Sequence, residues 1–242
     1  MKKIWKYRFY YYLALPGLVY FIIFHYVPMA GALIAFKDIS PFDGLQGFFD
    51  APWVGLKHFE RFTSSVYFYD VIENTLIISG LKILFGFPAP IIFALLLNEV
   101  LRMSLKRVMQ TISYLPHFIS WVVTAGMITA LLATSGGLIT ETINDFTGSS
   151  INFLGNKDYF VGILVTSHVW KTIGWSSIIY LAAMSSIDPA LYESARIDGA
   201  NRLQMAWHIT LPSIMFVIVI MFLLEIGNLL EAGFEQILLL YS

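Results

Sequence analysis

The chain has 242 residues, of which 57% are hydrophobic and 13% are charged. A soluble domain is usually about 25% charged, so the composition excludes an ordinary soluble fold and favours a polytopic membrane protein. The 15 Lys and Arg nearly balance the 16 Asp and Glu, and there is no cysteine. A basic nucleic-acid-binding surface, a disulfide framework, an iron–sulfur site and a thiolate zinc site are therefore not expected.

Five long apolar stretches predict transmembrane helices, because about 20 apolar residues cross a bilayer. The first stretch is free of charged residues and too long for the core of a signal peptide. Lys82 and Lys171 are the single charges of the second and fourth, and the fifth is too long for one straight span. We expect an all-α membrane protein with helices at about residues 10–34, 74–97, 112–133, 159–187 and 209–240.

Basic residues near the helix ends predict the orientation. Nine Lys and Arg lie in the N-terminal tail and in the loops after the second and fourth helices, against four in the alternate loops. The N-terminus is therefore expected in the cytoplasm. Five spans place the C-terminus outside, and we expect a sixth helix to be missing after Ser242.

Motifs of common enzyme chemistry are absent. The sequence has no G-x-x-x-x-G-K-[ST] phosphate loop, no H-E-x-x-H and no G-x-S-x-G. Its five histidines are far apart in sequence, which gives no local metal-ligand pattern. We expect neither a catalytic site nor a metal site in this chain.

Residues 188–208 form a loop between the fourth and fifth helices. Asp188 suits an N-cap and Pro189 the first helical position, so a short helix is expected to about Ile197. Gly199 supplies a turn, and a second short helix leads to Leu211-Pro212. The apolar residues of this loop suit either docking to a partner groove or lying on the membrane surface.

The spacing in this loop favours docking. The segment resembles the cytoplasmic signature of ABC importer permeases: Glu-Ala-Ala, three residues, Gly, nine residues, Ile-x-Leu-Pro. The matching positions here are Glu193, Ser194, Ala195, Gly199, Ile209, Leu211 and Pro212, with Ser194 replacing an alanine. The resemblance implies that this loop couples the membrane helices to an ATPase subunit.

The resemblance covers essentially the whole chain and points to the carbohydrate branch of these permeases. The matching stretches include Trp53–Phe59, Ile112–His117, Trp170–Trp175 and Gly233–Gln236. It implies one transmembrane domain over residues 1–242, with the type I ABC importer permease bundle, in a bacterial cell membrane. The implied partners are a second permease subunit, two ATPase subunits that bind ATP and Mg²⁺, and an extracellular solute-binding lipoprotein. No cofactor is expected in this chain.

Polar residues inside the spans are candidates for a substrate path, because such residues usually face the bundle interior. Sugars need hydrogen-bonding groups and aromatic faces. We therefore expect the path among Trp170, Lys171, Trp175, Glu225, Asn228 and Glu235. The alternative is hydrogen bonding or ion pairing between helices, for instance between Lys171 and Glu225.

The predicted function is transport of an oligosaccharide into the cytoplasm as the membrane subunit of an ATP-driven importer. One alternative is an ABC permease for another solute, such as an amino acid or phosphate. The other is a membrane enzyme or an assembly factor.

Overall fold

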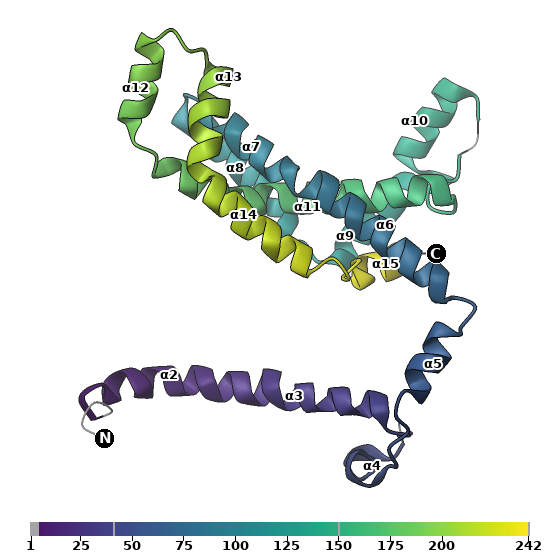
Figure 1. Cartoon of the computed structure of the whole chain (residues 1–242). Coiled ribbons are helices and arrows are strands. Elements are labelled where there is room, and N and C mark those ends of the chain that lie inside the picture. Colours follow the sequence, from purple (N-terminus) through teal and green to yellow (C-terminus); the bar gives the residue numbers. More distant parts are fainter. Residues whose placement is uncertain (1–4, 41, 150, 242) are drawn as a thin grey trace. The chain divides into compact units, whose positions relative to one another are not determined.

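The computed structural model describes residues 5–40, 42–149 and 151–241, which are very largely helical (Figure 1). Within these ranges, β pairing is limited to one isolated antiparallel bridge between Lys37 and Trp53. The chain divides into two units, and the boundary between them falls between Val71 and Ile72 in the sequence. From the sequence, the whole chain is expected to form one domain.

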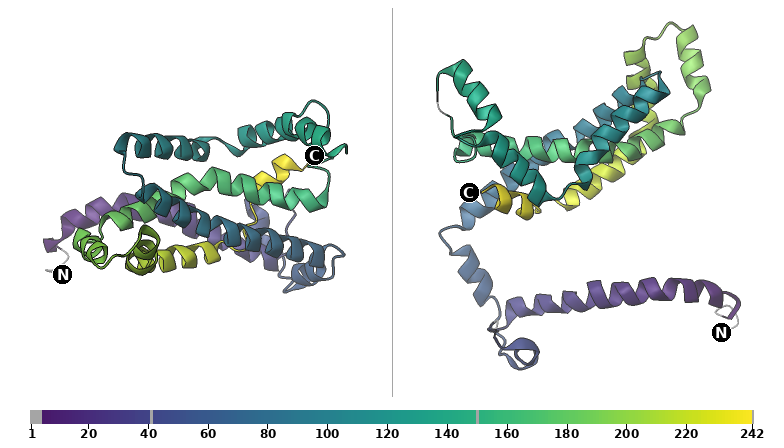
Figure 2. Two further views of the ribbon diagram at one scale, coloured as in Figure 1. Left: turned by 90° about the horizontal axis from the view of Figure 1, so that it is seen from above. Right: turned by 180° about the vertical axis from the view of Figure 1, so that it is seen from behind.

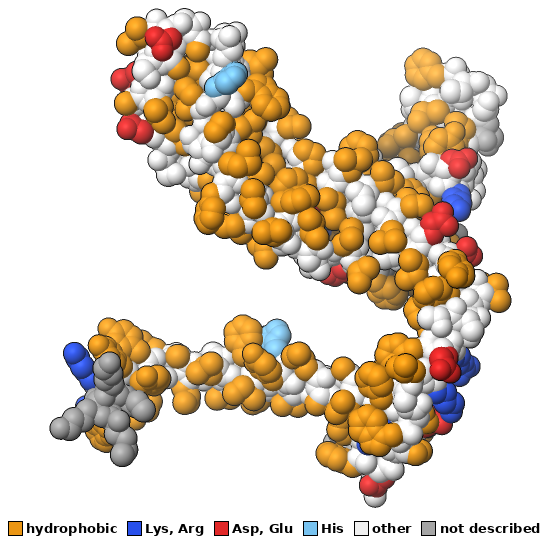
Figure 3. Space-filling view, in the orientation of Figure 1, with side chains coloured by type: hydrophobic (Ala, Val, Ile, Leu, Met, Phe, Trp, Pro, Cys, Tyr) orange, Lys and Arg blue, Asp and Glu red, His pale blue; other side chains and the backbone are white. Residues whose placement is uncertain are grey.

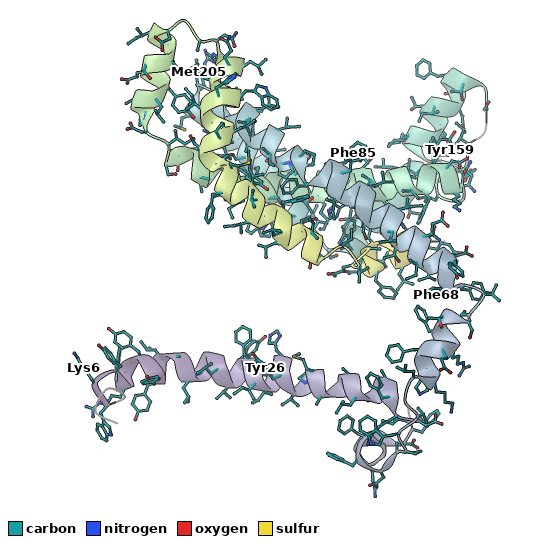
Figure 4. The ribbon with its side chains drawn as sticks, in the orientation of Figure 1. Lys6, Tyr26, Phe68, Phe85, Tyr159 and Met205 are labelled. Carbon is teal, nitrogen blue, oxygen red and sulfur yellow. The ribbon has the colours of Figure 1, made fainter. Side chains whose placement is uncertain are left out.

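The first unit begins with a continuous helical segment, Arg8–Phe36, that is long and apolar enough to cross a membrane. Its parts are α2 (Arg8–Phe21), the π-helical turn η1 (Ile22–Tyr26), α3 (Val27–Met29) and the 3₁₀ segment η2 (Ala30–Phe36). Within this unit, no part of its most apolar stretch is buried, and Figure 4 shows Tyr26 projecting from it. This segment lies where the sequence predicts the first span.

The rest of the first unit contains two short helices, α4 (Gly44–Asp50) and α5 (Lys57–Thr63). Lys37 is buried, and its ammonium donates hydrogen bonds to the carbonyls of Phe48 at 2.7 Å and Phe49 at 3.1 Å. Lys57 donates to the Asp38 carboxylate at 2.7 Å, and this contact lowers the pKa of that carboxyl. These contacts tie the end of η2 to both short helices.

The second unit is a helical bundle. Its elements, from the helix that enters it, are α6 (Phe68–Gly86), α7 (Pro88–Asn98), α8 (Met103–Phe118), α9 (Trp121–Leu132), α10 (Leu138–Thr147), α11 (Lys157–Ser185), α12 (Pro189–Ile197), α13 (Arg202–Met205), the π-helical turn η3 (Ala206–Thr210), α14 (Leu211–Gly227) and α15 (Phe234–Leu240). The long helix α11 packs against α7, α8 and α14, while α9 packs against α10 and α15. Figure 2 shows α12 and α13 at one end of this unit and α10 at the other.

Two apolar clusters hold the bundle together. One joins α7, α11 and α14 through buried side chains that include Ile91, Tyr180 and Ile214. The other joins α6, α9, α11 and α15, with Leu164 and Leu240 almost fully buried. Many large apolar side chains outside the clusters are exposed, and they cover the visible face of α14 (Figure 3). Such exposure suits a helix that meets lipid or another subunit.

Length and composition select three membrane-spanning segments among the described residues: Arg8–Phe36, Phe68–Asn98 and Arg202–Gly227. The pair α8 and α9, bent by 100°, would make a fourth. The 29-residue α11 is long enough to cross a bilayer but does not meet the same apolar criterion. The count is roughly that of the five predicted spans.

Two of the predicted spans are broken. The predicted helix at 112–133 is two helices, because Pro116 lies in the last turn of α8 and Ser120 caps the start of α9. The predicted helix at 209–240 ends at Gly227, and α15 begins after Gly233, whose φ is +86°. Glycine adopts that backbone conformation readily, which lets the chain turn back toward the bundle.

Candidate functional site

The first candidate site is the loop formed by α12, α13 and the turn between them. The Asp188 carboxylate accepts a hydrogen bond from the Ala190 amide at 3.0 Å, as an N-cap does. The helix ends at Ile197, and Gly199 follows with a φ of +81°. Asn201 and Gln204 then form a reciprocal capping box at the start of α13. Helix, turn and helix therefore follow from local sequence signals.

The loop is joined to the bundle by a few specific contacts. The Tyr192 hydroxyl lies 2.9 Å from the Thr210 hydroxyl, and Arg202 forms an ion pair with Glu99 at 3.1 Å. Met205, labelled in Figure 4, is buried. Residues Arg202–Gly227 form one unbroken helical segment through η3 and α14. A displacement of the loop would therefore act directly on α14.

The predicted coupling residues fall into two groups. Glu193, Ser194, Ala195 and Gly199 belong to α12 and its turn, and Glu193 lines a groove of about 750 Å³ between the loop and the end of α7. The other three, Ile209, Leu211 and Pro212, lie where η3 passes into α14. Leu211 packs against the cluster that joins α7, α11 and α14.

The outer surface of this loop is apolar at several positions. Ile197, Leu203 and Trp207 expose 87%, 69% and 62% of their surface. Tyr192 and Ala195, two other residues of the loop, are half-buried. The short helical hairpin of residues 188–208 thus exposes aromatic and aliphatic side chains that suit insertion into a partner's groove.

The second candidate site is a polar cavity of about 290 Å³ inside the second unit. Side chains from α6, α9, α11 and the α14–α15 region converge on it: Ser79, Lys82, Ile83, Trp121, His168, Glu225, Asn228, Glu231 and Gln236, with Gly233 of the turn. The Ser79 hydroxyl is buried, and no hydrogen-bond partner for it lies within the described ranges. Donors, acceptors and an indole ring thus line one space.

A hydrogen-bond network around Gln236 forms one wall of the cavity. Gln236 is 1% exposed, and its amide oxygen accepts from the Lys82 ammonium at 2.6 Å. Its amide nitrogen donates to the Leu164 carbonyl and the Ser167 hydroxyl, each at 2.8 Å. Lys82 also donates to the Ala232 carbonyl at 2.7 Å. This network fixes α15 to α6 and α11.

The structure separates the predicted substrate-path residues. Glu225 and Asn228 line the polar cavity together, although Asn228 lies just beyond the end of α14. Trp170 lines a different, mainly apolar cavity of about 600 Å³ between α9, α10 and α11. Glu235 is exposed and lies outside the polar cavity, whereas its neighbour Gln236 lines it.

The other two predicted residues contact α8. Trp175 stacks on His117 with ring centres 4.6 Å apart. Lys171 is buried, and its ammonium contacts backbone carbonyls at the end of α8. Within the part of the chain that the structure describes, the alternative ion pair between Lys171 and Glu225 is not formed.

Sequence reasoning missed several cavity residues. Trp121 is the first residue of α9, but the sequence predicts one continuous helix across this position. Gln236 follows Glu235 in an otherwise apolar stretch. Ser79 carried no distinguishing signal. No group of three or more His, Cys, Asp or Glu that could hold a metal ion is found among the residues described.

Comparison with known proteins assigns the family. Residues 86–240 match the family "Binding-protein-dependent transport system inner membrane component". The chain is 47% identical over 240 residues to the polygalacturonan/rhamnogalacturonan transport system permease protein YteP of Bacillus subtilis (strain 168), an alignment that covers 99% of this chain and 74% of that protein.

Solved structures agree with this match. A crystal structure of a bacterial ABC transporter involved in the import of the acidic polysaccharide alginate is similar over 100% of this chain and 80% of that one, with a TM-score of 0.88 and 42% identity. A second structure, of bacterial alginate ABC transporter in complex with alginate pentasaccharide-bound periplasmic protein, matches with the same TM-score and identity over 79% of its chain. The chain therefore has the ABC importer permease fold and belongs to the family of inner membrane components of binding-protein-dependent transport systems.

Proposed function

We propose that this chain is the membrane subunit of an ATP-driven importer that carries an oligosaccharide, delivered by an extracellular binding protein, into the cytoplasm. The observation that carries this proposal is the Glu193 to Pro212 spacing, realised as a capped helical hairpin that continues into α14. Membership of the family supports transport, and the named substrates of its relatives support a sugar polymer fragment as the solute.

The hairpin is the proposed contact with an ATPase subunit. Its exposed Ile197, Leu203 and Trp207 supply apolar surface, and the groove lined by Glu193 and Arg196 supplies charge. ATP and Mg²⁺ bind to the ATPase subunits, so this chain contributes no catalytic group. Closure of the ATPase pair moves the hairpin, and the unbroken helix from Arg202 transmits that movement to α14.

The polar cavity is the proposed part of the sugar path in this subunit. Sugar hydroxyls both donate and accept hydrogen bonds, and the cavity offers carboxylate acceptors at Glu225 and Glu231 and an amide at Asn228. The Trp121 indole offers an apolar face. A volume of about 290 Å³ suits one or two sugar rings at a time rather than a long fragment.

The proposed complex contains a second permease subunit, two ATPase subunits and the binding protein. The long helix Arg8–Phe36 is apolar enough to cross the membrane, which fits a segment that packs on another subunit or on lipid. The basic residues of the N-terminal tail and of the hairpin loop support a cytoplasmic N-terminus, with the hairpin on the same side.

Reconstitution with the cognate partners tests this proposal. The complete transporter in lipid vesicles is expected to hydrolyse ATP faster when the binding protein carries oligogalacturonides than when it is empty. The same assay with amino acids or inorganic phosphate tests the other solute classes. Stimulation by one of those solutes and not by an oligosaccharide would contradict the substrate class, and ATP hydrolysis indifferent to the binding protein would contradict the transport role.

A further inference from the structure

The bend between α8 and α9 exposes backbone carbonyls inside the bundle. The two helices meet at 100°, with only Ile119 and Ser120 between them. The last carbonyls of a helix have no partner within that helix, and inside a membrane each one without a donor is costly. The end of α8 therefore needs donors from another part of the chain.

Lys171 of α11 supplies these donors. Its ammonium donates to the carbonyls of Pro116 at 3.1 Å, of His117 at 3.4 Å and of Ile119. The residue is only 7% exposed. Every hydrogen bond of this ammonium within the described ranges goes to a backbone carbonyl of the bend, so it acts as a cap for α8 supplied from α11.

Two further contacts hold α8 and α11 together near the same point. A Cβ at Gly174 would collide with the backbone carbonyl of Ser113, so only glycine permits this approach. Trp175, one residue further on, stacks on His117 with an angle of 2° between the rings. The sequence stretches Ile112–His117 and Trp170–Trp175 are thus the two halves of one junction.

The junction also reaches the polar cavity through Trp121. The Lys171 ammonium lies 5.3 Å from the centre of the Trp121 ring, a distance at which a cation is attracted to the ring. Trp121 is the first residue of α9 and lines the cavity, whereas Lys171 does not line it. The ammonium thus contacts both the bend that carries α9 and the first aromatic side chain after it.

We infer that Lys171 is a positioning residue: it holds the Trp121 indole in place as a wall of the polar cavity against which a sugar ring packs. This inference rests on the proposed function of the cavity as part of the sugar path. It gives Lys171 a role through Trp121 in place of direct contact with substrate, and it explains why a lysine lies in this span without a carboxylate partner among the described residues.

A cysteine in the cavity provides the test. The native chain contains no cysteine, so Ile83→Cys gives one reporter thiol in this subunit, at a half-buried residue that lines the cavity and is not one of its proposed sugar-binding groups. The complete transporter in vesicles is labelled with a water-soluble maleimide in the presence of increasing oligogalacturonide or alginate pentasaccharide. The half-protecting concentration is then compared in four backgrounds: unchanged, Lys171→Met, Lys171→Arg and Trp121→Leu.

Lys171→Met keeps the length of the side chain but removes the charge and the donors. The half-protecting concentration is expected to rise about fivefold, the size of one aromatic contact, and by a similar factor in Trp121→Leu. The double variant is expected to resemble Trp121→Leu alone, because both changes remove the same wall. Lys171→Arg, the matched control, keeps a cation and donors and is expected to stay within about twofold of the parent.

The outcomes separate this inference from the proposed function. Protection in the parent that is unchanged by Lys171→Met, or effects of the two single variants that multiply in the double variant, would overturn the positioning role and leave the cavity assignment intact. No protection in the parent would overturn the cavity assignment and the inference with it. If Lys171→Met does not assemble, Lys171→Gln, which keeps an N–H donor, must give a half-protecting concentration between those of Lys171→Arg and Trp121→Leu; a value equal to the parent would refute the role.

Discussion

Replacing Gln236 by methionine is expected to weaken the bundle strongly, because the change keeps the size of a buried side chain and removes three hydrogen bonds. The bond to the Lys82 ammonium is the costly one, since a hydrogen bond to a charged group contributes about 1.5–3 kcal/mol. The two neutral bonds contribute about 0.6 kcal/mol each inside a membrane protein. We expect the free energy of unfolding to fall by about 3–4 kcal/mol.

Unfolding of the purified chain in bicelles by added SDS, followed by circular dichroism, measures this change. The matched control is Glu235→Gln on the same helix, an exposed position at which less than about 0.5 kcal/mol is expected. The double variant Lys82→Met with Gln236→Met is expected to be more stable than Gln236→Met alone, because no buried charge is left without its partner. A double variant as unstable as the sum of the two single variants would refute the reasoning.

The remaining predictions concern the hairpin and the orientation. Gly199→Val is expected to strain the turn by about 1–3 kcal/mol and to separate ATP hydrolysis from transport, because the φ of +81° suits glycine, while the space around its Cβ is open. Gly199→Asn serves as the control, because asparagine adopts a positive φ more readily than valine. Equal uptake by the native protein, Gly199→Val and Gly199→Asn would contradict the coupling role. Arg202→Gln is expected to change the free energy of unfolding by less than about 1 kcal/mol in a denaturation titration, since the ion pair with Glu99 is half exposed to solvent, and a larger loss would mean that the pair anchors the hairpin. A cysteine at Ser104 is expected to be protected from an impermeant thiol reagent in intact cells, and one at Ser149 to react; the reverse labelling would overturn the orientation.

Local features of the hairpin can be predicted from sequence. The Asp188 cap, Pro189 at the first helical position and a glycine turn at Gly199 each depend on a few neighbouring residues. For this reason the short helix expected from Pro189 to about Ile197 is present in the structure. At Gly199 the backbone φ is the constraint, because the space that a Cβ would occupy is open.

Contacts between distant residues could not be predicted in the same way. Lys82 and Gln236 are separated by 154 positions, and nothing in either apolar stretch indicates that they meet. The break before Trp121 lies in a stretch without charged residues, where only Pro116 and Ser120 indicate that one helix ends and another begins. The charge of Lys171 makes it a candidate for the substrate path, and the sequence does not indicate that its ammonium donates to the carbonyls of the bend.

Uptake of labelled oligogalacturonide into vesicles that contain the complete transporter tests the central claim most directly. With ATP and the binding protein present, the native chain is expected to accumulate the sugar. Glu225→Ala and Asn228→Ala, which remove the hydrogen-bonding groups proposed to contact the sugar in the cavity, are expected to lower uptake roughly 5- to 150-fold with basal ATP hydrolysis retained, since each lost bond costs about 1–3 kcal/mol. Accumulation that is absent while ATP is hydrolysed normally, or that is equal in the native chain and both variants, would contradict the account.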